Sequence, residues 1–331
     1  MKVPKKLLKQ RGDLIDTVEH FFREKGFLRV ETPSIYLFEE SNPNIKGIKV
    51  ILEHNGRTIN STLITSPEIY MKRLLAEGYG NIYQICKFFR NDEYGKIHNP
   101  EFLGLEFYEV GKDYNHTMNT TEELIKHLVF SHNLTVRNKN NEVIDFSKPF
   151  DRITIRELLI DHGLRLDSLE DREELKSKLK GKINISENDS FDDIFFKFFF
   201  TYIEPFLGIN RPIFLYDYPP SMCSMAKITN KKGIRIAERY ELYINQIEIC
   251  NGFSELIDSE EQAKRMLNDL SSKGISMGYD KVFVEALKKV PECSGNAVGL
   301  DRLFVVLLNL ESIKDIILFP LDEEIALYEK W

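Results

Sequence analysis

The chain has 331 residues, of which 42% are hydrophobic and 29% charged, a composition typical of soluble globular proteins with one large or two ordinary domains. The net charge of −7 argues against a surface that coats nucleic acid. No apolar run approaches the roughly 20 residues of a membrane span, and no apolar signal-peptide core follows the basic N-terminus. The four cysteines form no Cys-x-x-Cys pair, so we expect a reduced, cytoplasmic protein without a zinc site.

The first third of the sequence predicts two helices. Residues 13–25 place apolar side chains at helical spacing, and Gly26 marks the expected end of that helix. An extended segment follows at 27–30. A second helix opens at Thr65-Ser66-Pro67-Glu68, because Ser66 can cap it and proline is tolerated at the first helical position.

Further elements follow in chain order. Strands are expected at 81–88 and 102–110, a helix at 114–133, a hairpin at 239–252 and a helix at 259–273. Residues 149–210 are mainly helical in pattern and highly charged, and we interpret them as an insertion whose phenylalanine-rich stretch, 191–200, forms core. The sequence therefore predicts a single catalytic domain over residues 1–331.

The first strand pair surrounds a loop with the chemistry of a nucleotide site. Phe89-Arg90-Asn91-Asp92 leaves one strand, and His98-Asn99-Pro100-Glu101-Phe102 enters the next. A planar cation suits a phosphate, loop polar groups suit a base edge, and an aromatic ring can stack on the base. Near the C-terminus, Arg302 lies in the first turn of a predicted helix, where it could reach a terminal phosphate.

The strand after this loop carries a charge that needs a partner. Side chains alternate faces, so one face receives Phe102, Gly104, Glu106 and Tyr108, while the leucines and Phe107 form a buried back face. A carboxylate in a half-buried strand is costly unless it is paired. A cationic headgroup of a ligand would pair with Glu106, and a structural lysine or arginine is the alternative.

The predicted hairpin supplies two further carboxylates. If Asn245-Gln246 is a two-residue turn, Glu248 lies opposite Tyr243 and Glu241 lies opposite Cys250. The two glutamates are then diagonal neighbours on one face, roughly 7–8 Å apart. Such a pair can hold Mg²⁺ against a triphosphate, although a solvent-facing glutamate pair would have the same pattern.

Taken together, these motifs resemble the catalytic core of lysyl-tRNA synthetases, which are class II aminoacyl-tRNA synthetases. The resemblance rests on Ser66-Pro67-Glu68, the block from Arg90 to Phe102, Glu106-Phe107-Tyr108, Asn251-Gly252-Phe253-Ser254-Glu255-Leu256 and Gly299-Leu300-Asp301-Arg302. It implies an α+β fold with an antiparallel sheet flanked by helices. The helix and strand around Gly26, ending in Pro33, resemble motif 1 of the class, which implies a homodimer.

About ten residues precede the first predicted helix, too few for the anticodon-binding OB domain of lysyl-tRNA synthetases, so we expect no such domain and no tRNA partner. A stand-alone core resembles the elongation factor P–lysine ligases. These are implied to activate (R)-β-lysine with ATP and to attach it to a lysine of elongation factor P. Ala297 stands where similar lysyl-tRNA synthetases have glycine, and the added methyl could shift preference from an α- to a β-amino group.

The resemblance also implies roles residue by residue. Arg90 and Arg302 would be the catalytic cations that bind the α- and γ-phosphates. The implied ATP-binding residues are Arg90, Asn91, Asp92, His98, Asn99, Phe102, Glu248, Ile249, Gly299 and Arg302. Those around the amino-acid substrate are Ser66, Pro67, Glu68, Glu106, Tyr108, Asn251, Glu255 and Ala297, and Glu241 and Glu248 would hold Mg²⁺.

Two other functions fit the same motifs. One is a lysyl-tRNA synthetase-like enzyme that activates L-lysine for RNA or for dinucleotide polyphosphate synthesis. The other is a non-catalytic regulatory paralogue, against which the retention of Arg90, Glu241, Glu248 and Arg302 argues. Asp92 is one methylene shorter than the glutamate usual in the family, so its contact with the base is expected to shift.

Overall fold

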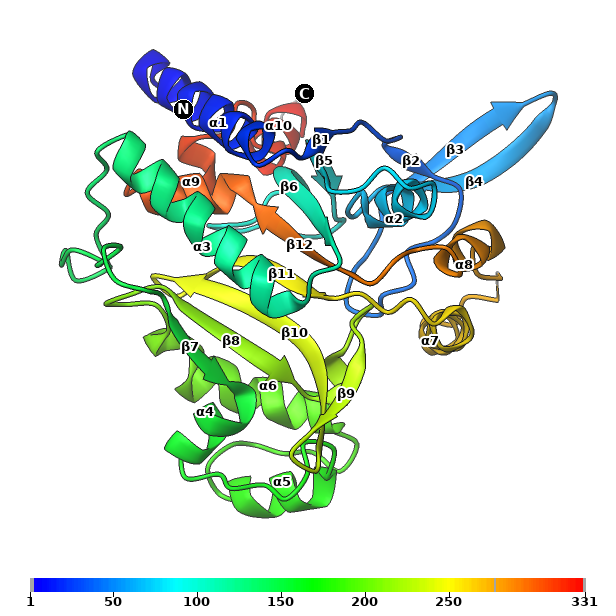
Figure 1. Cartoon of the computed structure of the whole chain (residues 1–331), viewed down its shortest axis with the longest axis vertical. Coiled ribbons are helices and arrows are strands. Elements are labelled where there is room, and N and C mark those ends of the chain that lie inside the picture. Colours follow the sequence, from blue (N-terminus) through cyan, green and yellow to red (C-terminus); the bar gives the residue numbers. More distant parts are fainter. Residues whose placement is uncertain (1–2, 277, 330–331) are drawn as a thin grey trace. The chain divides into compact units, whose positions relative to one another are not determined.

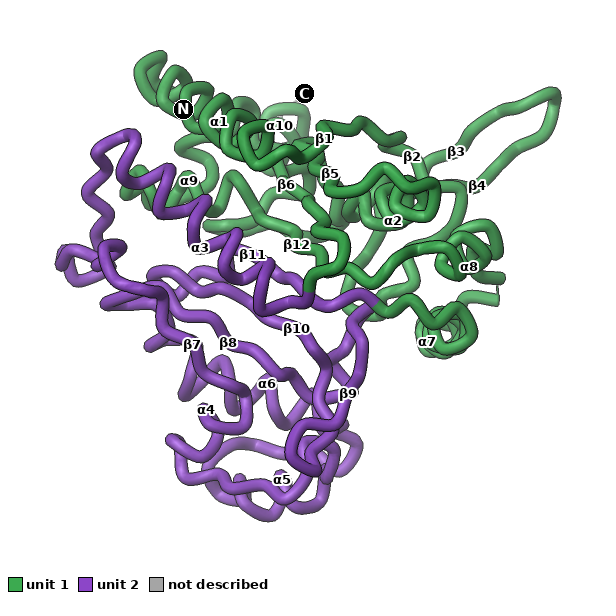
Figure 2. Tube along the Cα trace, viewed as in Figure 1, with its two compact units in different colours: residues 1–112, 256–331 green, residues 113–255 purple. Residues whose placement is uncertain are grey.

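The computed structural model describes residues 3–276 and 278–329. These form two compact units, one from Met1–Lys112 with Leu256–Trp331 and one from Asp113–Glu255 (Figure 2). Within the two described ranges, no helix has both the length and the apolar character that a membrane span requires. The strands and helices of each unit are described in turn below.

The sheet of the first unit runs β1-β5-β6-β12, with β1 parallel to β5 and the other neighbours antiparallel. A second antiparallel sheet, β2-β4-β3, ends in a hairpin that projects from the unit (Figure 1). The elements are α1 (Lys5–Glu24), β1 (Leu28–Arg29), β2 (Ile35–Tyr36), β3 (Lys49–His54), β4 (Arg57–Leu63), α2 (Glu68–Ala76), β5 (Ile82–Phe89), β6 (Glu101–Val110), α7 (Ser259–Ser272), α8 (Lys281–Leu287), β12 (Cys293–Gly299), α9 (Leu300–Leu307), a 3-10 turn (Ile313–Asp315) and α10 (Leu321–Tyr328).

The first helix covers the back of this sheet. Its apolar stripe buries Phe22, whose ring stacks on Tyr83 at 5.0 Å and also contacts Phe107. Leu105 and Phe107 are fully buried, as the alternation along β6 predicts. The helix begins at Lys5, well before the predicted start at residue 13, because residues 5–12 are mostly good helix formers and Pro4 precedes them.

The second unit carries the sheet β11-β10-β8-β7, with β9 paired to β10 and β7 parallel to β8. Its elements are α3 (Tyr114–Ser131), β7 (Asp151–Thr154), α4 (Ile155–Asp161), α5 (Arg172–Leu179), α6 (Phe191–Tyr202), a 3-10 turn (Glu204–Phe206), β8 (Ile213–Tyr218), a 3-10 turn (Pro220–Met222), β9 (Ile228–Lys231), β10 (Ile234–Ile244) and β11 (Ile247–Ser254). Helix α6 starts with a capping box at Ser190 and buries Phe191, Phe195, Phe198 and Phe199, which confirms the phenylalanine cluster as core.

The β10–β11 hairpin confirms the predicted turn and corrects its register. Asn245 and Gln246 both have positive φ, 50° and 70°, as a tight hairpin turn with this twist requires. Tyr243 lies opposite Glu248 as predicted. A β-bulge then shifts the register by one residue, so Glu241 lies opposite Asn251 and not Cys250.

The predicted fold class is confirmed. Both units combine a mainly antiparallel sheet with helices, which is an α+β arrangement. In the first unit, β6 pairs with β5 on one side and with β12 on the other, so side chains of the three strands lie next to one another in cross-strand rows. The candidate site is built on one of these rows.

Candidate active site

Glu106 is at the centre of a cross-strand row in the first unit. Gln84 on β5 and Ala297 on β12 are its direct neighbours, and directly opposed residues of antiparallel strands share a face. The Glu106 side chain is almost completely buried, and the Tyr108 hydroxyl donates a hydrogen bond of 2.7 Å to its Oε1. Among the residues that the structure describes, Oε2 of Glu106 has no hydrogen-bond partner.

This environment disfavours the charged form of Glu106. Burial, together with the nearby Glu68 carboxylate, raises the pKa of Glu106 to about 8. The Tyr108 hydrogen bond and the charges of Lys72 and Arg90 act in the opposite direction, but they do not compensate. The positive charges near Glu106 therefore do not balance its carboxylate, and a cationic ligand would supply the missing charge.

Glu68 already has a cationic partner. It begins α2 after Ser66 and Pro67, and the Ser66 hydroxyl accepts the Glu68 N–H at 3.3 Å. One turn later the buried Lys72 donates to Glu68 Oε1 at 2.6 Å. The sequence analysis missed Lys72, although its spacing of four residues from Glu68 is the signal of a helical ion pair. The buried face of α2 consists of Met71, Lys72 and Leu75.

Arg90 lies between the two parts of the predicted substrate site. Its guanidinium carbon is 5.3 Å from the centre of the Phe102 ring, and its charge acts on Glu106. Arg90 has a long ion pair with Glu93, at 3.9 Å, and within the described structure its buried Nε has no hydrogen-bond partner. A partly buried guanidinium with an unused donor is suited to a phosphate or carboxylate oxygen.

Four of the predicted ATP-binding residues line one narrow cavity: His98, Asn99, Phe102 and Arg302. Burial and the neighbouring Arg302 lower the pKa of His98, so its imidazole is neutral near pH 7. The cavity wall also includes Glu93 and Asp301, but Asp301 is already paired with Arg11, so the Arg302 guanidinium is suited to an anion. Arg302 also donates through Nε to the backbone carbonyl of Ile97 at 3.3 Å.

Asn99 uses its amide on the backbone. Its Nδ2 donates to the Glu101 carbonyl at 2.6 Å, and its Oδ1 accepts the N–H of Leu321 at 3.1 Å. These bonds connect the end of the loop to the first residue of α10. Asn99 therefore fixes the backbone just before Phe102 by hydrogen bonds to other backbone groups of the protein.

Asp301 is a residue that the sequence analysis left without a role. It is completely buried, and its Oδ1 accepts hydrogen bonds from the Arg11 guanidinium, one of them at 2.9 Å. Its Oδ2 accepts the N–H of Leu103 at 2.7 Å. Asp301 therefore connects α1, β6 and α9 and determines where its neighbour Arg302 and the Phe102 ring lie.

The start of the nucleotide loop is held by another loop. The N–H of Asn91 donates to the Lys46 carbonyl at 2.7 Å, and the exposed Asp92 carboxylate is 3.4 Å from the Lys46 ammonium. Asp92 has a positive φ of 67°, a conformation that aspartate tolerates in tight turns. The support for this segment therefore comes from residue 46, far away in the sequence.

The space at Gly104 is occupied by a side chain of the protein, the ring of Phe88, and is not open to a ligand. A Cβ at this position would lie 2.6 Å from the Phe88 ring, and Phe88 in turn contacts the Phe102 ring at 5.5 Å. Gly299, its cross-strand partner on β12, caps α9. Gly104 therefore opens no space beside Glu106, because the ring of Phe88 fills it.

The second unit contains the remaining predicted site residues, all in the segment of β10–β11 and Glu255. Glu241 accepts hydrogen bonds from the hydroxyls of Tyr218 at 2.6 Å and Tyr243 at 2.8 Å, and it pairs with Arg239. Burial and the Glu241 charge raise the pKa of both phenols, which remain protonated donors. Arg239 also donates to Asn251 Oδ1 at 2.9 Å.

Glu248 contributes to the same charged environment, because its charge acts on Arg239 and Tyr243. Ile249 is buried beside it at the bulge, and Glu255 is a buried carboxylate next to the end of β11. Among the described residues no group of three metal-ligating side chains occurs. Both oxygens of Glu241 accept hydrogen bonds from Tyr218, Tyr243 and Arg239, so Glu241 would have to exchange one of these partners to bind Mg²⁺.

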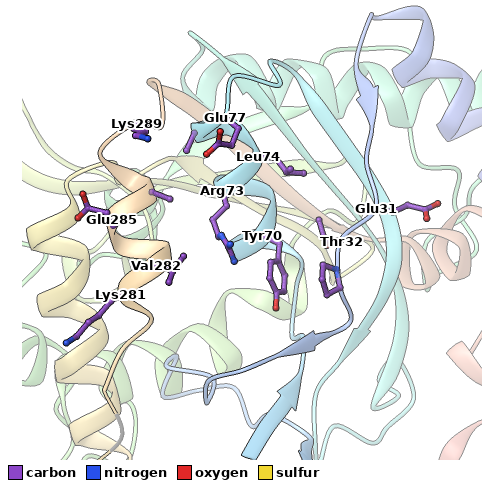
Figure 3. Close-up of a pocket in the computed structure, with 13 residues that line it drawn as sticks. Glu31, Thr32, Tyr70, Arg73, Leu74, Glu77, Lys281, Val282, Glu285 and Lys289 are labelled. Carbon is purple, nitrogen blue, oxygen red and sulfur yellow. The ribbon is translucent and has the colours of Figure 1, made fainter. Parts of the chain in front are cut away.

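A wide cavity of the first unit lies elsewhere. It measures about 770 Å³ and lies between α2, α8 and the segment that follows β1. Figure 3 shows Tyr70 and Arg73 of α2 and Lys281, Val282 and Glu285 of α8 on its walls. None of the predicted site residues lines it, so its size does not mark it as the reaction site.

Comparison with known proteins agrees with this geometry. The family model of class II tRNA synthetases (D, K and N) matches residues 2–323. The chain belongs to this family. It is 35% identical over 326 residues to an elongation factor P–(R)-β-lysine ligase of Vibrio atlanticus, a match that covers 95% of both chains. A ligase of the same name from Yersinia pestis is 34% identical over 322 residues, again with 95% of both chains covered.

A lysine–tRNA ligase of Campylobacter jejuni is 36% identical over 318 residues, which are 94% of this chain and 62% of that protein. The family and these relatives show a lysyl-tRNA synthetase-like, ATP-dependent ligase.

The raised pKa of Glu106 predicts how its substitution changes stability with pH. The folded protein keeps a proton on Glu106 up to about pH 8, whereas the unfolded chain loses it near the ordinary pKa of a glutamate. The stability of the wild type therefore falls as pH rises towards 8. Glu106→Gln removes this dependence, so it should gain on the order of 1–3 kcal/mol over wild type between about pH 6 and 9.

Urea unfolding across this pH range, without substrate, measures the difference. Glu101→Gln is the matched control, because Glu101 lies on the same strand but is exposed and paired with Lys87. Parallel pH profiles for wild type and Glu106→Gln would contradict the buried, protonated carboxyl.

Proposed function

We propose that this protein activates (R)-β-lysine with ATP and ligates it to a lysine side chain of elongation factor P. The observation that supports this most directly is Glu106, a buried carboxylate without a full set of partners, next to Ala297. A dication such as β-lysine has two ammonium groups, for which Glu106, Glu68 and Tyr108 would provide acceptors. The names of the Vibrio and Yersinia relatives support the same substrates.

The first step joins the amino acid to AMP. The substrate carboxylate attacks the α-phosphorus of ATP, an acyl–phosphate bond forms, and pyrophosphate leaves. Arg90 would bind the α-phosphate and the attacking carboxylate, Arg302 the γ-phosphate, and Phe102 would stack on adenine. Asn251 would bind the substrate carboxylate. Catalysis of this kind consists of positioning and charge stabilisation, and no residue has to act as a nucleophile.

Glu241 and Glu248 would hold Mg²⁺, which neutralises charge on the triphosphate when it is bound. In the second step the amine of the acceptor lysine attacks the acyl carbonyl, an amide bond forms, and AMP leaves. A homodimer and a cytoplasmic location remain part of this proposal, on the basis of the resemblance to the synthetase class.

The alternative is a lysyl-tRNA synthetase-like enzyme that uses L-lysine, and the identity to the Campylobacter lysine–tRNA ligase favours it. The two functions differ in where the substrate amine lies. Ala297 is the direct neighbour of Glu106 on β12, so its methyl group lies beside the carboxylate that would bind an amine. Shape at this position therefore distinguishes the α- from the β-isomer.

ATP–pyrophosphate exchange with each amino acid tests the proposed function. We expect exchange with (R)-β-lysine well above that with L-lysine, followed by transfer to elongation factor P. Arg90→Ala should lower exchange by about 10²–10³-fold, as the loss of one preorganised donor does. Preference for L-lysine would favour the synthetase-like alternative, and exchange with neither amino acid despite ATP binding would indicate a regulatory paralogue.

Ala297→Gly tests the origin of the preference. Removing the methyl group beside Glu106 should reduce the ratio of kcat/KM for (R)-β-lysine over L-lysine by about tenfold, because one methyl or methylene in a pocket contributes about 1–3 kcal/mol. The ratio comes from the exchange assay with both isomers, and an unchanged melting temperature shows that the strand is intact. An unchanged ratio would remove residue 297 from the account of specificity.

A further inference from the structure

Lys273 makes an unusual set of hydrogen bonds at the C-terminal end of α7. Its ammonium donates to three backbone carbonyls of one loop: Glu40 at 2.7 Å, Asn42 at 2.9 Å and Ile45 at 2.9 Å. An ammonium has three N–H donors, so these three acceptors use all of them. Charge-assisted hydrogen bonds to carbonyls are strong, and a partly buried ammonium loses their benefit if the loop changes its path.

The loop that Lys273 holds, residues 40–46, connects two predicted substrate-binding segments. At its start, the Glu40 carboxylate accepts the Thr65 hydroxyl, immediately before Ser66, and the N–H of Asn42 at 2.8 Å. At its end, the Lys46 carbonyl accepts the N–H of Asn91, immediately after Arg90, at 2.7 Å. The charge of Lys273 also acts on Asp269, one turn earlier in α7.

We propose that Lys273 is a positioning residue that holds loop 40–46 and, through it, the Arg90–Asp92 segment and the segment before Ser66 in their substrate-binding arrangement. Lys273 contacts neither predicted substrate. It acts by hydrogen bonding to three backbone carbonyls at once, which requires a compact cation with several donors. The inference rests on the proposed function for its effect on catalysis, but its effect on the loop does not depend on which amino acid is used.

Loss of such support has a characteristic kinetic result. If the loop is competent for only a fraction of the time, the apparent affinity for substrate falls by that fraction, while bound enzyme reacts normally. We expect Lys273→Met to raise KM for ATP by about tenfold with kcat nearly unchanged. A merely destabilised protein would show the reverse, a lower kcat from fewer folded molecules and an unchanged KM.

Hydrogen exchange of the full-length protein without substrates tests the loop directly. In Lys273→Met the amide of Asn91 should exchange about tenfold faster than in wild type, because its acceptor on Lys46 is no longer fixed. Amides of α3 should keep their wild-type rates. Lys264→Met is the control, since Lys264 is an exposed lysine on the same helix, and Lys273→Arg should recover part of the protection.

The outcomes separate the two claims. Unchanged exchange at Asn91 in Lys273→Met would overturn the positioning role, whatever the enzyme activates. Faster exchange with an unchanged KM for ATP would also overturn it, because the loop would then not matter for substrate. Failure of wild-type protein to catalyse pyrophosphate exchange with either lysine isomer would contradict the proposed function and leave the exchange result at Asn91 as the test of Lys273.

Discussion

The candidate site depends on the cost of burying the Glu106 carboxylate in the middle of a strand. Burial and the nearby Glu68 favour its protonated form, and the charges of Lys72 and Arg90 do not reverse this. Proteins retain such a group where a ligand completes its environment, since a structural role would be served better by a neutral side chain. Without a ligand, the buried Glu106 carboxylate is therefore unfavourable, and a substrate ammonium beside it would lower this cost.

Much of the surrounding structure serves to hold this row in place. Asp301 connects three elements through Arg11 and the N–H of Leu103, and it is completely buried. The absence of a side chain at Gly104 makes room for the ring of Phe88, which packs against the ring of Phe102. The residues that would bind ATP are therefore held in position by residues that would not contact it, such as Asp301 and Phe88. Adenylate formation requires this kind of preorganisation.

Sequence reasoning located the parts that depend on local pattern. The helical stripe of α1 and the two-residue turn at Asn245-Gln246 are properties of neighbouring residues, and both were predicted correctly. Burial along β6 does not alternate as predicted, because residues 104–109 are buried on both faces. The position of Glu241 was wrong, because a bulge depends on how two strands fit together and not on either one alone. Asp301 and Lys273 act over separations of about 200 residues, which no periodicity reveals.

We propose that a substrate ammonium takes the place of the proton on Glu106. Titration calorimetry with (R)-β-lysine at pH 7, in two buffers with different heats of ionisation, counts the protons released on binding. The account predicts release of about one proton per site from wild type and almost none from Glu106→Gln, because the pKa of Glu106 falls when a cation binds beside it. Binding with the same heat in both buffers would show that Glu106 does not receive the substrate charge.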